Sequence, residues 1–281
     1  MKKIPLILAA ALCLFLGREA GAAETPPATA LDKILAKREL RCGYLVYSPY
    51  IRRDLNSGQL SGVFHDIVEA IGHNANIKII WAEEVGFTEM LTGLDARRYD
   101  AYCGGLWPNA TRAGAGYFSR PGFYSVITAW AKADNAKLGK DLSELNSDKI
   151  TISSVDGAME DLIASADFPK AKRLSLPTVT PFAQNMLNVT TGKADVTFVE
   201  PSMMAEFLKS NPGGLRELYG GKPLRIFGNS LVVRRGDNEL LHFFDNAMDE
   251  IVYSGKMEEI LKKYEPIPGA FRRVALPYQT P

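Results

Sequence analysis

The sequence has few of the residues from which metal centres are built. Its 281 residues include three cysteines and three histidines. The histidines, His65, His73 and His242, are widely spaced, and the sequence has no zinc-type spacing of cysteines and histidines. It also lacks the motifs of a phosphate loop or a nucleophile elbow. We therefore expect neither a metal site nor a cofactor.

The chain has no excess of either charge. Its 33 Lys and Arg residues nearly balance its 32 Asp and Glu residues, the net charge at pH 7 is +1, and the basic residues are dispersed. A protein that binds nucleic acid needs a basic stripe or patch to meet the phosphates. The sequence therefore argues against a nucleic-acid partner.

Beyond its first residues the chain has no apolar run long enough to cross a bilayer. The start, Met1-Lys2-Lys3, then an apolar run from Ile4 to Leu16 and the small residues Gly21-Ala22-Ala23, predicts a cleaved secretory signal over residues 1–23. Cys13 lies in the apolar run without the small residues that precede a lipid-attached cysteine, so we expect no lipid anchor. The mature chain is predicted to be soluble and periplasmic or secreted.

Two cysteines remain in the mature chain. Cys42 and Cys103 lie in the strand-like runs 40–46 and 100–104. An oxidising compartment permits a disulfide if these strands are neighbours, as the first and third strands are in an order of 2-1-3, but parallel neighbours rarely have bridging geometry. Two buried thiols and a disulfide both remain open.

Helix-period and strand-like segments alternate from Leu31 onward, which is typical of an α/β protein with a mostly parallel sheet. A second, similar βα set begins near Ala131. The mature length of about 258 residues favours two domains over one. The extended runs Val126–Lys132 and Ile226–Val233 are the expected crossings between them.

These crossings predict a discontinuous first lobe. We expect residues 24–128 and 231–281 to form lobe 1 and residues 129–230 to form lobe 2.

The most informative segment is Tyr99–Arg112, which places an arginine just beyond a strand-like run that ends at Gly104 and Gly105. Parallel sheets bind ligands at this end of their strands. A guanidinium can hold a carboxylate with two charge-assisted hydrogen bonds, which a lysine cannot do with the same geometry. A single arginine is more often a solvated surface residue, but this context makes Arg112 the leading site residue.

Several segments in the same order resemble the family 3 extracellular solute-binding proteins, the receptors of polar amino-acid ABC transporters. They are Leu31–Leu35 with Leu40–Gly43, Gly58–Gly62 with Asp66, Tyr99–Arg112 with Phe118–Pro121, Lys193–Pro201, and the ending Leu231–Asp237 with Ser254–Tyr264. Together these segments, in this order and spacing, span nearly all of the mature chain.

The resemblance implies two α/β lobes, each with a doubly wound, mostly parallel sheet, joined by a two-strand hinge and closing over a small ligand. It implies that Arg112 holds the ligand's α-carboxylate and that Glu200 takes its α-ammonium. Opposite charges in one water-poor cleft suit a zwitterion, since each buried charge then has a partner. Taken alone, Glu200 reads as an acidic N-terminal cap of the helix that starts at Pro201, and both roles can coexist.

Further ligand-binding residues follow from the same resemblance. Tyr50 matches the aromatic residue that stacks over the ligand side chain, and Gly105 ends the strand-like run. Gly157 and Ala158 match a helix start whose backbone N–H groups face the carboxylate; Ala158 lacks the hydroxyl usual there. Trp107 replaces a small hydroxyl residue, and would fill space or offer a stacking face if it points inward.

Three other residues differ from those usual in the family, so the sequence defines the class of ligand less well than the class of protein. Asn109 replaces a threonine, and Phe64 and Tyr117 replace frequent acids.

The sequence thus predicts a monomeric receptor that delivers a small amino acid or other carboxylate-bearing metabolite to a membrane permease. A rival reading is an enzyme on the same fold, similar to the cyclohexadienyl dehydratases, with Glu200 or His65 as its acid. A third is a ligand-sensing domain that signals through a separate partner.

Overall fold

The computed structural model describes residues 28–178 and 180–274, so the predicted signal segment 1–23 and Cys13 lie outside the described residues. The helices are α1 Ala30–Lys37, α2 Val63–Ala75, α3 Met90–Asp95, α4 Ala110–Ala113, α5 Met159–Asp167, α6 Ala183–Thr190, α7 Pro201–Ser210, α8 Asn238–Tyr253 and α9 Lys256–Tyr264, with 3-10 turns at Leu142–Leu145 and Tyr219–Gly221.

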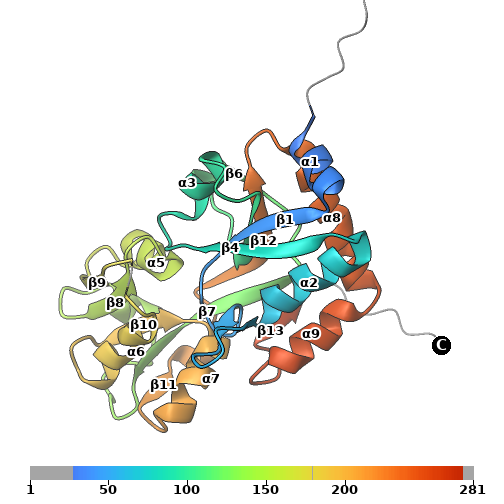
Figure 1. The fold of residues 1–281 in the computed structure, drawn as a ribbon. Helices are drawn as coiled ribbons and strands as arrows, with labels where there is room; N and C mark the ends of the chain where they lie inside the picture. The colour runs from blue at the N-terminus through green and yellow to red at the C-terminus, as the bar shows by residue number, and fades with distance from the viewer. Residues whose placement is uncertain (1–27, 179, 275–281) are drawn as a thin grey trace, which may run out of the picture.

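The strands form one long mixed sheet and a separate two-stranded ribbon (Figure 1). They are β1 Glu39–Tyr44, β2 Arg52–Arg53, β3 Leu60–Ser61, β4 Lys78–Glu84, β5 Ala101–Leu106, β6 Gly116–Phe118, β7 Phe123–Lys132, β8 Thr151–Val155, β9 Lys172–Leu176, β10 Val196–Val199, β11 Leu215–Glu217, β12 Arg225–Arg234 and β13 Phe271–Arg273.

The long sheet contains two parallel sets joined by antiparallel strands. Its order is β4-β1-β5-β12-β7-β10-β8-β9, in which β1 is parallel to β4 and β5, and β8 is parallel to β9 and β10. The predicted α/β, two-lobed fold class is confirmed, and here the two sets share one hydrogen-bonded sheet.

Strands β7 and β12 connect the two sets. The first half of β12, residues 225–229, pairs with residues 123–127 of β7, and its second half pairs with β5. The rest of β7 pairs with β10. The lobe boundaries predicted after residues 128 and 230 therefore fall inside these two strands.

Separate apolar cores lie on the two sides of these strands. On one side α2, α8 and α9 pack against β1 and β5 (Figure 1). Ile67, Val68 and Ile71 form the buried face of α2, as their helical spacing predicts. On the other side α5, α6 and α7 flank β8 and β10. Leu162 of α5, in contrast, is 41% exposed.

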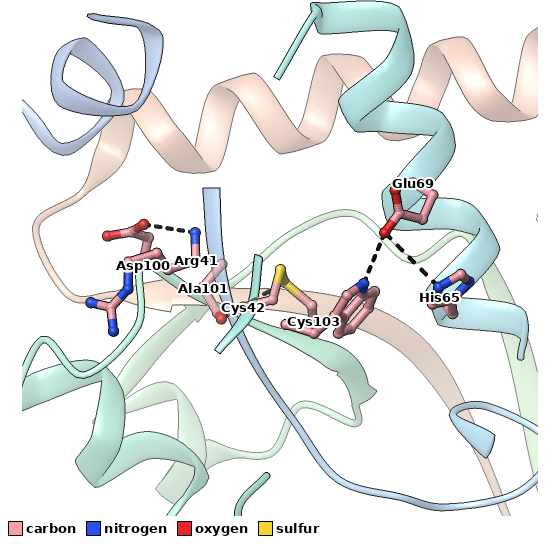
Figure 2. The surroundings of a disulfide bond; sticks show 8 residues. Arg41, Cys42, His65, Glu69, Asp100, Ala101 and Cys103 are labelled. Atoms are coloured by element: carbon pink, nitrogen blue, oxygen red, sulfur yellow. Dashed lines mark hydrogen bonds and ion pairs between the residues drawn. A yellow bond between two sulfur atoms is a disulfide. The ribbon is translucent and has the colours of Figure 1, made fainter. Parts of the chain in front are cut away.

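A disulfide joins the neighbouring parallel strands β1 and β5. Cys42 and Cys103 are bonded, with their Cα atoms 5.5 Å apart, so the structure decides between the two alternatives left by the sequence. Figure 2 shows the bond beside α2, where Glu69 Oε1 accepts a 2.9 Å hydrogen bond from Trp81 Nε1. The bond ties the two strands together just before both reach the cavity described below.

The described residues were considered for membrane-spanning helices and for groups of metal ligands. In residues 28–178 and 180–274, none of the helices has both the length and the apolar character needed to cross a membrane. The same part of the chain contains no group of three or more His, Cys, Asp and Glu side chains suited to holding a metal ion.

Candidate functional site

A cavity that is partly open to solvent lies where the carboxyl ends of β1 and β5 face α5 and the end of β10; its space, with the opening included, is about 460 Å³. Five of the seven ligand-binding residues expected from the sequence line it: Tyr50, Gly105, Trp107, Arg112 and Glu200. The chain brings them together because parallel strands deliver their C-terminal loops to one edge of the sheet.

Gly105 forms part of the cavity wall that β5 contributes, and only a glycine fits at this position. Gly105 has φ of 77°, a left-handed conformation that side chains other than glycine rarely adopt. A Cβ atom at Gly105 would also overlap the ring of Phe64, which is fully buried beneath it. The cavity floor can therefore be formed only where residue 105 lacks a side chain.

The short helix α4 carries Arg112 into the cavity. Asn109 caps this helix, since its Oδ1 accepts a 2.8 Å hydrogen bond from the backbone N–H of Arg112. Arg112 Nη1 donates to the carbonyl of Trp107 at 3.0 Å, and Nη2 donates to the carbonyl of Gly157, just before α5, at 3.3 Å. Burial lowers the pKa of the guanidinium, which nevertheless remains charged at neutral pH.

Trp107 lies between the cavity and the crossing strand β12. It lines the cavity, and its ring stacks on Phe227 with centroids 4.7 Å apart and planes at 9°. Its Nε1 donates a 2.9 Å hydrogen bond to Asn229 Oδ1. One face of this ring is thus occupied by Phe227, and the indole N–H is satisfied.

A chain of hydrogen bonds runs from Asn229 to Glu200. Asn229 Nδ2 donates to Ser125 Oγ at 2.8 Å, and Ser125 Oγ lies 2.7 Å from the Tyr50 hydroxyl, which donates to Glu200 Oε2. Because Tyr50 uses its proton on the carboxylate, Ser125 is the donor to Tyr50. All of these donors point toward Glu200, an arrangement that suits an anion at the end of the chain.

Glu200 is at the N-cap position of α7, as its place before Pro201 suggests, but its side chain makes no capping hydrogen bond. It turns to Tyr50 and is only 1% exposed. Burial raises the pKa of its carboxyl to about 7, against the hydrogen bonds that lower it. Within the described residues its Oε1 has no hydrogen-bond partner.

A second buried carboxyl, Glu160, also lines the cavity, and the sequence analysis missed it. It lies in the first turn of α5 and is 2% exposed. Burial, together with the charge of Glu200, raises the pKa of Glu160 to about 8, while the nearby Arg112 lowers it. Its Oε1 is likewise unpaired in the part of the chain that the structure describes. An acid in a first helical turn is usually exposed at the surface, so the residue type alone gave no signal.

Aromatic rings form much of the remaining wall. The Tyr50 ring is flanked by Tyr47 and Phe123, with centroid distances of 5.9 and 6.0 Å and planes at 23° and 14°. Tyr47, also missed from the sequence, lines the cavity and contacts Phe182 of the other core edge-on at 5.2 Å. Phe87 precedes α3 and also lines the cavity.

Three predicted residues lie outside the lining. Gly157 and Ala158 precede α5; Gly157 reaches the site only through its carbonyl bond with Arg112, and Ala158 is fully buried at the N-cap position. His65 is on α2, where it pairs with Asp66 at 3.0 Å and stacks on Trp81 at 5.4 Å. His65 does not line the cavity, so its candidacy as an acid in this cavity is wrong.

The chain is similar to known solute-binding proteins in both of the following comparisons. The family model described as bacterial extracellular solute-binding proteins, family 3, matches residues 40–266. An L-arginine-binding protein of Pseudomonas aeruginosa is 23% identical over 269 residues, which cover 94% of this chain and 96% of that protein.

Two solved structures illustrate the likeness in fold. An ancestral amino acid-binding protein, a precursor of cyclohexadienyl dehydratase, has a TM-score of 0.74 at 23% identity, over 85% of this chain and 100% of its own. A solute receptor for L-cysteine from Neisseria gonorrhoeae has a TM-score of 0.72 at 16% identity, over 87% of this chain and 99% of its own.

Proposed function

The chain belongs to the bacterial extracellular solute-binding proteins, family 3, and from this premise we propose that it is the amino-acid-binding receptor of an ABC transporter. The observation that carries the proposal is that Arg112 and Glu200 both line one cavity. A guanidinium and a carboxylate in the same cavity complement the carboxylate and ammonium of an α-amino acid.

In this proposal Arg112 holds the ligand's carboxylate. Its present bonds go to two neutral backbone carbonyls, whereas bonds to a carboxylate are charge-assisted and roughly twice as strong. Glu200 takes the ammonium through its unpaired Oε1, while Tyr50 keeps Oε2 in place. Each buried charge then has a partner, as burial requires.

The other predicted site residues have supporting roles in this proposal. Gly105, Trp107 and Tyr50 shape the wall against the ligand, and Gly157 and Ala158 position the start of α5. The two lobes close over the ligand by bending β7 and β12, with the predicted boundaries at residues 128 and 230.

The protein then works outside the cytoplasm as a monomer and hands its ligand to a membrane permease. Family membership supports an extracellular site of action. The ligand named for the Pseudomonas relative is L-arginine and that named for the Neisseria receptor is L-cysteine, so relatives of this fold serve different amino acids.

Titration calorimetry with a panel of amino acids tests this function. Arg112→Ala should weaken binding at least about thirtyfold, since removing one partner of a buried charge pair costs about 2 to 5 kcal/mol. The exposed Arg272→Ala is the matched control and should bind as the wild type does. Unchanged affinity in a folded Arg112→Ala variant would remove this residue from the site.

The dehydratase alternative has one observation in its favour. A buried carboxyl whose pKa lies near 7, as at Glu200, also suits a general acid. Incubation with prephenate or arogenate distinguishes the two functions, because a dehydratase releases an aromatic product that absorbs in the ultraviolet. Turnover by the wild type that is lost in Glu200→Gln would overturn the receptor; unchanged substrate supports it.

A further inference from the structure

The charged groups around the cavity do not balance. Arg112 is the cation among its lining residues, and Glu160 and Glu200 are both acids. With all three ionised the site carries a net charge of −1. A zwitterionic amino acid with a neutral side chain brings no net charge, so it would leave one carboxylate without a counter-charge.

Both carboxyls are built to receive a further partner. Each has an Oε1 that makes no hydrogen bond within residues 28–178 and 180–274, although Glu160 and Glu200 are only 2% and 1% exposed. A buried carboxylate without a partner is unfavourable by several kcal/mol. The missing partner is therefore either a proton or a cation that the ligand brings.

Building on the proposed function, we infer that the ligand is a basic amino acid, with one carboxylate and two cationic groups, and that Glu160 is the residue that selects for the second cation. Arg112 takes the carboxylate, and Glu160 and Glu200 share the two cationic groups. The site with its ligand is then neutral, and the free carboxyl oxygens both gain donors.

The apolar wall of the cavity suits such a side chain. Tyr47 and Phe87 line it with rings that meet edge-on, their centroids 6.1 Å apart. Aromatic faces attract ammonium and guanidinium groups, the more so when water is excluded. Met159 next to Glu160 adds a flexible apolar surface against which the methylene groups of a long side chain can pack.

Two pairs of matched ligands test the inference by calorimetry at pH 7. Citrulline has the shape of arginine without its charge, and norleucine lacks the terminal ammonium of lysine. The wild-type protein should bind arginine or lysine at least about thirtyfold more tightly than the uncharged counterpart. This comparison needs no variant and so does not depend on how a substitution affects folding.

Glu160→Gln then identifies the residue responsible. The variant should lose most of the preference for the charged member of each pair, because the amide keeps the shape and removes the charge. Glu239→Gln, an exposed position on α8, is the control and should keep the preference.

The outcomes separate this inference from the function on which it rests. Equal affinity for arginine and citrulline, and for lysine and norleucine, would overturn the basic ligand while leaving an amino-acid receptor. A preference retained by folded Glu160→Gln would overturn the role of Glu160. Failure of every amino acid to bind would overturn the proposed function as well.

Discussion

At the scale of single residues, the two buried carboxyls have protonation states that depend on folding. Glu160 and Glu200 have pKa values of about 8 and 7 in the folded protein, above the ordinary value of 4.5, chiefly because burial disfavours the charged form. The charges that face Glu160 are Glu200, Arg112 and Asp161. A carboxyl whose pKa is raised by folding binds its proton more tightly in the folded state.

This linkage predicts how stability depends on pH in the absence of ligand. The stabilisation from these protons is fully present near pH 4.5 and is lost as pH rises through about 7 and 8. Urea unfolding from pH 5 to pH 9 should therefore show a falling free energy of unfolding, and Glu160→Gln should flatten the decline. A Glu160→Gln variant with the wild-type slope would show that Glu160 does not titrate in this range.

Some of the site residues could be predicted from the sequence, and others could not. Arg112 and Glu200 follow strands in recognisable motifs, so their arrival at the cavity follows from topology. Glu160 and Tyr47 line the cavity only because α5 and the loop after β1 face each other across it. This arrangement depends on packing between residues more than 100 positions apart, and the local spacing of apolar residues cannot predict such contacts.

At the scale of elements, the pairing of β1 with β5 fixes part of the cavity wall. The disulfide lies between these strands, and Tyr47 and Gly104 follow its two cysteines by a few residues and line the cavity. The disulfide therefore both stabilises the core beside β1 and β5 and holds in place the residues that follow these strands and line the cavity.

Removal of this disulfide should destabilise the protein. Cys42 and Cys103 are 61 residues apart, and closing a loop of that length in the unfolded chain corresponds to about 4 kcal/mol by chain entropy. The double variant Cys42→Ala, Cys103→Ala should lower the free energy of unfolding by about 2 to 4 kcal/mol in denaturant titrations. Reduced wild-type protein is the control, and an unchanged unfolding midpoint in both would contradict this expectation.

Long elements were predictable and short ones were not. The apolar spacing in α2 and α8 and the extended runs in β7 and β12 gave their places in advance. The strands β2, β3, β6 and β13 have two or three residues each, too few for a periodic pattern. β6 and β13 are defined by their distant partners β12 and β7, and β2 and β3 by pairing with each other across a short loop.

At the scale of the whole molecule, contacts between the two sets of elements hold them together. Arg112 bonds to Gly157 at 3.3 Å, Arg52 pairs with Glu206 at 2.9 Å, and Tyr47 packs on Phe182. Glu160 and Glu200, in contrast, each have an Oε1 without a hydrogen-bond partner among residues 28–178 and 180–274. A ligand that supplies their counter-charges should therefore shift the population toward the closed form.

The resemblance to a known family predicted this architecture better than composition or periodicity did. Alternating helices and strands indicate an α/β fold, and the extended runs 126–132 and 226–233 indicate two crossings, but neither pattern shows that β7 and β12 are antiparallel partners of β10 and β5 in one sheet. The lobe limits at residues 128 and 230 remain a prediction, which closure of the molecule about β7 and β12 would support.

Small-angle X-ray scattering with and without saturating arginine is the measurement that tests capture between closing lobes most directly. We expect a smaller radius of gyration with arginine, because a few residues in each crossing strand absorb the bend that closes the lobes. Arg112→Ala at the same arginine concentration should keep the profile of the free protein. Identical free and arginine-saturated profiles of the wild type, with binding verified by calorimetry on the same sample, would contradict a receptor that closes over its ligand.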